Sequence, residues 1–306
     1  MKRKKDWKTL LSIVMLGFVF VIWVYILFMP EISIAANGAA VNQTLNTTVN
    51  VTNSAPEVRS VVCPSTVDLD AYGNTTVLCN VTVYDYDNNT AKVNATFYYY
   101  LNRTDQPNDK NTHYTNVTCS NDTQQDFYMN FTCGFNVAYF TNNGTWYSNV
   151  TAEDVGTATG DNRSSSLRIN PLIALYIPDN TVLNYGEMNY NDISTDKLAN
   201  VTNAGNIRVN VSIQGWGTTR GDNLSMVCSY GSIPIGYQKY HINPNQNYET
   251  VMLGLNSTNT LIRNWNINKT TNENSPSMNT TYWKLKIPTG VGGICQGKVM
   301  FTASLY

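Results

Sequence analysis

The 306-residue sequence predicts an all-β protein, with two antiparallel β-sandwich domains after one N-terminal transmembrane helix. Three observations support this fold. From Val58 onward, short runs of alternating apolar and polar residues are separated by Gly, Asn, Asp and Pro, as in antiparallel sheets. After Pro30, no long stretch has apolar residues at helical spacing. One long apolar run lies near the N-terminus.

The apolar run extends from Leu10 to Met29 and follows five basic residues. Twenty helical residues span about 30 Å, the thickness of a bilayer core. Pro30 ends the helix because it lacks the N–H that a further turn needs. The basic flank holds residues 1–8 inside as a cytoplasmic tail. We therefore expect residues 9–30 to anchor the chain in membrane lipid. The protein would then be a single-pass protein of the cell membrane, with its C-terminus on the extracellular surface.

A cleaved signal peptide is the alternative reading of this segment. Ser33 and Ala35 are small residues at the spacing required for a cut after Ala35. The apolar core of a signal peptide usually has about 7–15 residues. The greater length of this run favours an uncleaved segment.

Twenty Asn-X-Ser/Thr sequons follow the apolar run. Random pairing of the 42 Asn with the 55 Ser and Thr residues would give about 7 or 8 sequons. This excess indicates a heavily N-glycosylated surface protein. The sequon asparagines are Asn42, Asn46, Asn50, Asn74, Asn80, Asn88, Asn94, Asn102, Asn116, Asn121, Asn130, Asn143, Asn149, Asn162, Asn200, Asn210, Asn223, Asn256, Asn268 and Asn279.

Charge and cysteine content agree with an extracellular location. Only 13% of residues are charged, and the chain after residue 8 has 15 basic and 20 acidic groups, without a basic stripe. Nucleic acid is therefore not an expected partner. Six Cys residues predict three disulfides, while two His and no C-x-x-C argue against a zinc site. Spacing does not determine the pairing, but we expect the sequential pairs Cys63–Cys79, Cys119–Cys133 and Cys228–Cys295.

Residues 31–55 form a predicted stalk that carries three sequons. Glycans at every fourth residue would stiffen it. Alternatively, Val41, Leu45, Val49 and Val51 belong to a detached strand that inserts into a neighbouring subunit. The choice between a stalk and a donated strand remains open in the sequence.

Two β-rich blocks follow, at residues 56–170 and 171–306, and each is long enough for one sandwich core. Several sequons read Asn-Val-Thr and lie in predicted strands. Because residues i and i+2 of a strand share a face, Asn and Thr would point outward and Val inward. Solvent-exposed sheet faces favour sandwiches over α/β layers, whose helices cover the sheet. The expected strands span residues 76–83, 129–135, 146–151, 206–213 and 298–301.

The first block resembles the immunoglobulin-like modules of prokaryotic, especially archaeal, cell-surface glycoproteins. The residues that carry the resemblance are the acidic turn at 85–89, the Gly-Thr-Trp run that leads to Ala152 and Asp154, and Gly160-Asp161-Asn162. The second block is similar to β-sandwich domains of envelope and fibre proteins at residues 203–206 and 283–301. The resemblance implies a structural or adhesive role and no catalysis.

Five acidic residues form the strongest candidate metal site. They could converge at one end of the first sandwich, and their hard oxygen ligands suit Ca²⁺. The alternative is ordinary Asp and Asn turn chemistry. We expect no cofactor, with calcium as the exception to test. These candidate ligands are Asp85, Asp87, Glu153, Asp154 and Asp161.

Other motifs have ordinary structural interpretations. Arg220-Gly221-Asp222 matches an integrin tripeptide but is also a good turn. The aromatic run at 97–100 could bind sugar, or could be one strand with alternate rings in the core. His113 and His241 have no partners at the spacing of a catalytic triad. No motif for a nucleophile, a zinc protease or a phosphate loop is present.

Three functional hypotheses follow. The first is a non-catalytic, membrane-anchored, N-glycosylated surface protein with an envelope-structural or adhesive role. Its partners would be lipid, its own glycans, and other copies or other envelope proteins. The second is a subunit of an extracellular filament that assembles by strand donation. The third, a secreted carbohydrate-active enzyme, requires paired carboxylates that the sequence neither shows nor excludes.

Overall fold

The computed structural model describes residues 15–24, 44–101, 105–179 and 181–306. The chain divides into two units, residues 1–51 and residues 52–306. The prediction of an all-β protein is confirmed, since antiparallel strands supply nearly all the regular structure of the larger unit. Both β-rich blocks fall within that unit, so their division into separate domains at residue 170 stays a prediction.

The expected single-pass membrane topology is contradicted. The described helix covers residues 15–24, and ten residues at 1.5 Å per residue reach about 15 Å, half the thickness of a bilayer core. Within the described ranges, no helix is long and apolar enough to cross a membrane. The remaining residues of the expected span, and the cleavage site after Ala35, lie outside the described residues.

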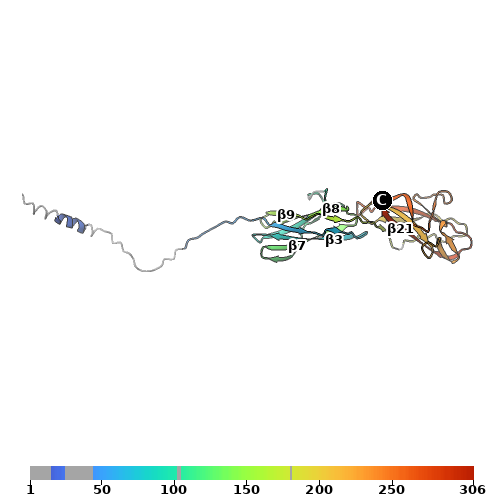
Figure 1. Cartoon of the computed structure of the whole chain (residues 1–306), viewed down its shortest axis with the longest axis horizontal. Coiled ribbons are helices and arrows are strands. Elements are labelled where there is room, and N and C mark those ends of the chain that lie inside the picture. The colour runs from blue at the N-terminus through green and yellow to red at the C-terminus, as the bar shows by residue number, and fades with distance from the viewer. Residues whose placement is uncertain (1–14, 25–43, 102–104, 180) are drawn as a thin grey trace, which may run out of the picture. The chain divides into compact units, whose positions relative to one another are not determined.

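The first block is a sandwich of two sheets (Figure 1). One sheet has the order β1-β3-β7-β6, with β1 Glu57–Val62, β3 Asn74–Tyr84, β7 Tyr128–Ala138 and β6 Ser120–Gln125. The other has the order β2-β10-β8-β4-β5, with β2 Thr66–Val67, β10 Leu167–Ile169, β8 Gly144–Asp154, β4 Thr90–Tyr99 and β5 His113–Asn116. Strand β9, Thr159–Arg163, pairs with β8. All pairs are antiparallel except β10–β2.

The second block contains three sheets. The largest has the order β11-β12-β19-β16-β17, with β11 Leu175–Tyr176, β12 Lys197–Asn203, β19 Met278–Leu285, β16 Gln238–His241 and β17 Leu253–Gly254. A second has the order β18-β13-β21, with β18 Thr260–Ile267, β13 Val209–Trp216 and β21 Lys298–Leu305. The third has the order β15-β14-β20, with β15 Ser232–Pro234, β14 Leu224–Tyr230 and β20 Gly292–Gln296. A 3₁₀ turn, η1, spans Ile235–Tyr237.

Each block has its own apolar core, but the two cores differ in how well they are covered. Among the described residues, the first core contains 23 buried residues and three partly buried ones packed against it. The second contains 11 buried residues and ten partly buried ones. Trp146 and Trp283 are fully buried at the respective centres. The second core is therefore the less completely covered of the two.

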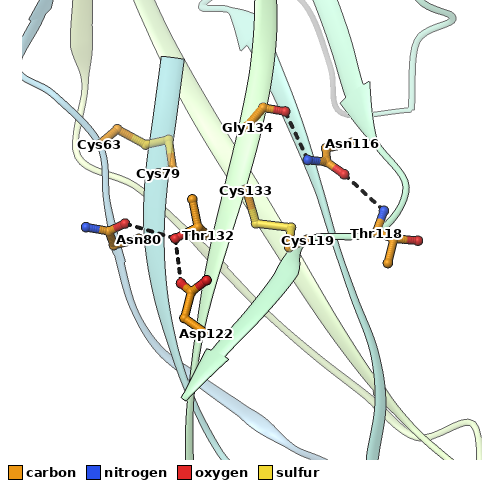
Figure 2. The surroundings of a disulfide bond; sticks show 10 residues. All are labelled: Cys63, Cys79, Asn80, Asn116, Thr118, Cys119, Asp122, Thr132, Cys133 and Gly134. Atoms are coloured by element: carbon orange, nitrogen blue, oxygen red, sulfur yellow. Dashed lines mark hydrogen bonds between the residues drawn. A yellow bond between two sulfur atoms is a disulfide. The ribbon is translucent and has the colours of Figure 1, made fainter. Parts of the chain in front are cut away.

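Three disulfides tie strands together, and they join the pairs named above. Cys63–Cys79 and Cys119–Cys133 lie in the first block, where Cys79 on β3 and Cys133 on β7 are register partners on neighbouring strands, and Figure 2 shows both disulfides. Cys228–Cys295 links β14 to β20 in the second block.

The two blocks meet where β7 ends and β8 begins. Lys269 of the second block donates hydrogen bonds to Asn111 Oδ1 (2.8 Å), the Phe140 carbonyl (3.1 Å) and Asn142 Oδ1 (2.5 Å). Tyr72 stacks on Tyr176 with ring centroids 4.0 Å apart. The other end of β8, at Asp154, therefore lies about 33 Å from this junction, since a strand rises about 3.3 Å per residue.

Candidate functional site

The candidate site is an apolar groove in the second block, between two strand edges. Strand β21 pairs with β13 on one side and ends its sheet on the other. Strand β12 is bonded to β11 only at Thr202 and Asn203. On the side of β12 that faces away from β19, residues 197–201 therefore have no strand partner within the described structure. Such open edges present backbone N–H and C=O groups to an incoming strand.

A hollow of about 700 Å³ lies between these edges. Its walls include Ile177 and Leu183 from the segment after β11, Ala199 from β12, and Val299 and Phe301 from β21. Lys298 is the one charged side chain among the described lining residues. A second hollow of about 520 Å³ shares Leu183 and Cys295 with the first. The surface is thus suited to apolar contact rather than to acid–base chemistry.

Strand β21 shows that the core is incompletely covered here. On β13, the core-facing Val209, Val211 and Ile213 are 0% exposed. Their register partners on β21, on the same face, are Leu305, Ala303 and Phe301. Phe301 and Ala303 are only partly buried, and Leu305 is 65% exposed. One further strand against β21 would cover this face as β21 covers β13.

The polar groups next to the groove satisfy one another. Ser225 Oγ donates to Gln238 Oε1, and Gln238 Nε2 donates to the Tyr185 hydroxyl at 2.9 Å. Burial raises the pKa of Tyr185 above its ordinary value. This chain of side chains has a structural role and holds no activated nucleophile.

The expected calcium ligands are partly brought together, at the end of the first sandwich where β8 finishes. Asp85 is fully buried and accepts hydrogen bonds from the backbone N–H of Asp87 and Asn89 and from the Thr90 hydroxyl. Burial alone would raise the pKa of Asp85, but these hydrogen bonds outweigh it and lower the pKa. Asp85 therefore organises the turn at 85–90.

Two more of these carboxylates bind the chain that precedes the sandwich. Asp154 accepts a hydrogen bond from Asn53 Nδ2 (2.6 Å), and Asp87 accepts one from the Ser54 N–H (2.6 Å). Glu153 and Asp161 instead occupy paired strand positions on β8 and β9, opposite Thr159 and Thr151. Within the described ranges, no cluster of three or more acidic, His or Cys side chains is arranged to hold a metal.

The Arg220-Gly221-Asp222 motif forms a closed turn. Asp222 accepts hydrogen bonds from the backbone N–H groups of residues 217, 218, 219 and 224. Desolvation opposes ionisation, but these donors lower the pKa of Asp222 to about 2. The Arg220 guanidinium lies 5.1 Å from the centre of the Trp216 ring. The carboxylate is thus committed to its own loop.

The aromatic run at 97–100 lies at the end of β4 and the turn that follows. Phe97 is in the core, Tyr98 is 7% exposed, and Tyr100 is half exposed. His113 is buried with Nδ1 3.3 Å from Asn108 Oδ1, and His241 accepts a hydrogen bond from the Asn243 N–H. Sequons Asn42 and Asn102 lie outside the described residues. The groove itself was missed by sequence reasoning, because it arises from strand order.

Comparisons with known proteins assign no family. No family model and no curated protein matches the sequence. Similar solved structures include the "GspB Siglec domain", with 18% identity over 43% of this chain and 64% of that domain (TM-score 0.23). Another is the C-terminal domain of the Streptococcus agalactiae AgI/II polypeptide BspA, with 10% identity over 81% of this chain and 95% of that one (TM-score 0.22). A DUF4466 family protein from Parabacteroides merdae has 9% identity over 77% and 100% (TM-score 0.22). With TM-scores this low, we base no argument on these likenesses.

Proposed function

We propose that this protein is a non-catalytic, extracellular, N-glycosylated structural subunit that polymerises by strand donation. Residues 44–51 of one copy extend the open edge of β21 in the next copy and fill the groove between β12 and β21. The observation that carries the proposal is the match between this uncovered groove and an exposed, alternating segment of the same chain.

The donor segment has the residue pattern of a half-buried strand. Leu45, Val49 and Val51 are 87%, 85% and 77% exposed, and residues 44–51 have no strand partner within the described structure. As a strand, the segment would place these three side chains and Thr47 on one face. The other face would carry the sequon residues Asn46 and Asn50. One face therefore suits an apolar groove, and the other suits solvent and glycans.

Length and energy are adequate for such an insertion. Eight residues span about 26 Å as a strand, and β21 also has eight residues. Full burial of each Leu or Val side chain contributes about 1.5–3 kcal/mol. The backbone hydrogen bonds along β21 would add to this, as in other cases of strand addition.

The donor cannot reach the groove of its own chain. Asn53 and Ser54 are hydrogen-bonded at the Asp154 end of the first sandwich, and the second block begins about 33 Å away at the other end of β8. Val51 lies two residues before Asn53, so it stays within about 7 Å of it. Even Leu45 reaches no further than about 28 Å. The acceptor must therefore be another copy.

Two walls of the groove lie in stretches of the chain without sequons, whereas the β12 edge contains the sequon Asn200. Residues 163–199 and 280–306 contain no sequon, although the chain has twenty. The groove walls formed by Ile177 and residues 181–183, and by residues 295–301, lie in these two stretches. These two walls would therefore stay accessible to an incoming strand in the glycosylated protein.

Net charge favours head-to-tail contact. Residues 52–170 contain twelve acidic and six basic side chains, whereas residues 171–306 contain seven acidic and nine basic. Strand donation would bring the acidic end of one copy toward the more basic block of the next. Opposite net charges favour this encounter over head-to-head contact.

The experiment compares two adjacent substitutions in the full chain by size exclusion with light scattering. Leu45→Asp places a charge on the groove-facing side, and Asn46→Asp places the same charge on the glycan-facing side at the loss of one sequon. Both residues precede the folded unit, so neither substitution disturbs it. We expect wild type and Asn46→Asp to form large assemblies and Leu45→Asp to remain monomeric.

If the wild-type protein is a discrete glycosylated monomer, the proposal of strand donation is wrong. The protein would then act on the cell surface as a single subunit. If Leu45→Asp assembles as well as Asn46→Asp, the polymer uses another contact. Treatment of the assemblies with detergent separates a strand-exchanged polymer, which should survive, from loosely associated material.

A further inference from the structure

The outer face of the first sheet carries a regular cross-strand pattern. On β3 the outward residues run Asn, Thr, Tyr, and on the antiparallel β7 they run Tyr, Asn, Thr. The register places each sequon Asn opposite the Thr of the other sequon and pairs the two tyrosines. The pairs are Asn80 with Thr132, Thr82 with Asn130, and Tyr84 with Tyr128.

The second sheet repeats the same pattern. Its outward residues run Asn, Thr, Tyr on β4 and Tyr, Asn, Thr on β8. The pairs are Asn94 with Thr151, Thr96 with Asn149, and Tyr98 with Tyr147. A slip of one residue in either register would destroy the arrangement, because side chains alternate between faces. Its occurrence on both faces of one sandwich indicates a built feature.

We propose that these two faces are platforms for the chain's own N-linked sugars. The first sugar on Asn130 lies over the ring of Tyr128, and the first sugar on Asn149 lies against Tyr147. The proposal rests on the glycosylation part of the proposed function and is independent of strand donation.

The geometry on the first sheet leaves one ring open. Tyr84 is held from two sides, by the Arg59 guanidinium 4.7 Å from its ring centre and by Tyr128 in an edge-to-face contact at 4.7 Å. Tyr128 itself is 47% exposed. It lies two residues before Asn130 on the same face, about 7 Å away along the strand. Sugar C–H groups carry partial positive charge and are attracted to the negative face of such a ring.

The Asn130 side chain is held in a position compatible with a sugar. The Thr82 hydroxyl donates to Asn130 Oδ1 at 3.0 Å, and Asn130 Nδ2 donates to Thr123 Oγ1 at 3.0 Å. The amide nitrogen has two hydrogens, so a sugar replaces one while the other keeps the bond to Thr123. Figure 2 shows the other half of the arrangement, with Thr132 beside Asn80 and Asp122.

On the second sheet, an unsatisfied hydroxyl marks the corresponding position. Thr96 Oγ1 is buried without a hydrogen-bond partner, and Thr96 faces Asn149 in the register. A bond from this hydroxyl to Asn149 Oδ1 would repeat the Thr82–Asn130 contact. Tyr147 stands two residues before Asn149, with the Arg163 guanidinium 4.5 Å from its ring centre.

The test combines peptide mass spectrometry with a double-mutant cycle on the glycosylated full chain. We expect Asn130 to carry a sugar. Removing it, by Asn130→Gln or by Thr132→Val, should lower the melting temperature by about 2–4 °C. In a Tyr128→Thr background, the same removal should have less than half that effect. Asn121→Gln, which removes a sequon of the same sheet without a Tyr two residues before it, should give equal effects in both backgrounds.

Chemical nitration of Tyr128 distinguishes direct contact with a sugar from a purely structural role of Tyr128, because only a sugar over the ring would slow the reaction. The Tyr128 ring should react several-fold more slowly in the glycosylated protein than in Asn130→Gln. Equal nitration rates, equal melting shifts in the two backgrounds, or an unoccupied Asn130 would each overturn the platform. Assembly measured on the same samples should be unchanged, so a failed platform and a failed strand donation are distinguishable.

Discussion

Asn53 and Asp154, 101 residues apart in the chain, are joined by a 2.6 Å hydrogen bond from Asn53 Nδ2 to Asp154 Oδ2. Asn53 Oδ1 in turn accepts a hydrogen bond from Asn89 Nδ2 at 2.9 Å. These contacts hold Asn53, just after the donor segment, at the end of the first sandwich that is far from the groove of the same chain. We call the hydrogen bonds of Asn53 to Asp154 and Asn89 the clasp. Because of the clasp, the donor segment can reach only the groove of another copy.

Removal of the clasp should loosen this end of the sandwich. Asn53→Ala deletes a hydrogen bond to a nearly buried carboxylate, a loss of about 1.5–3 kcal/mol in the free energy of unfolding. Chemical denaturation of the full chain measures it. Ser54→Ala is the matched control, because Ser54 contributes only its backbone N–H to Asp87. If Ser54→Ala loses as much stability as Asn53→Ala, the Asn53 side chain does not stabilise this end of the sandwich.

Acid should weaken the same end through Asp85. Its hydrogen bonds hold the pKa below the ordinary value of 3.8 against the opposing effect of burial. A carboxyl group with a lowered folded-state pKa contributes stability above its unfolded-state value, and that stability is lost as pH falls through the folded-state pKa. Asp85→Asn should lose about 1–2 kcal/mol at pH 6 and show a weaker pH dependence below pH 4. If the free energy of unfolding falls by the same amount between pH 6 and pH 3 in wild type and in Asp85→Asn, Asp85 does not have this role.

The disulfide Cys228–Cys295 should matter for assembly as well as for stability. It closes a separation of 67 residues, and Cys295 lines both hollows. Replacing both Cys residues by Ala should cost about 4 kcal/mol in the chain-entropy account and reduce assembly in light scattering. Replacing the Cys119–Cys133 pair, with a separation of 14, should cost about 3 kcal/mol and leave assembly intact. Equal effects on assembly would mean that the groove is not the contact.

Lys269 should stabilise the junction of the two blocks in a pH-dependent way. Burial lowers its pKa to about 8, although the nearby Asp109 acts in the opposite direction. Between pH 8 and 10.5 the unfolded chain holds this proton more tightly than the folded one, so the Lys269 contribution to stability rises with pH. Lys269→Met leaves three carbonyl oxygens without a donor and should lose about 1–3 kcal/mol at pH 7. The difference in the free energy of unfolding between wild type and Lys269→Met should increase from pH 8 toward pH 10. A difference that does not change with pH would contradict this role of Lys269.

Local patterns in the sequence predicted much of the fold. The alternation at 76–83 and 129–135 corresponds to the paired strands β3 and β7, since a two-residue period is read directly from residue order. The Asn-Val-Thr sequons place Val81 and Val150 in the core, as the period requires. The membrane span inferred from hydropathy is the part that is contradicted, because the described helix has only ten residues.

The candidate site depends on features that residue order does not contain. Asp85, Asp87 and Asp154 lie at one end of the first sandwich, and their hydrogen-bond donors are backbone N–H groups, the Thr90 hydroxyl and the Asn53 amide. A list of acidic residues does not contain these donors. The groove exists because β21 ends its sheet and β12 lacks a partner over most of one edge. The alternation of Leu45, Val49 and Val51 suggested a donor, whereas the acceptor could be recognised only in three dimensions.

Amide hydrogen exchange on the assembled protein tests strand donation most directly. The account predicts that residues 44–51 gain protection on assembly together with the alternate amides of residues 298–305 that point away from β13, since the two strands would bond to each other. In the Leu45→Asp monomer, the donor segment and these outward-pointing amides of β21 should exchange quickly. Assembled protein in which residues 44–51 still exchange at the rate of an unstructured chain would contradict the account.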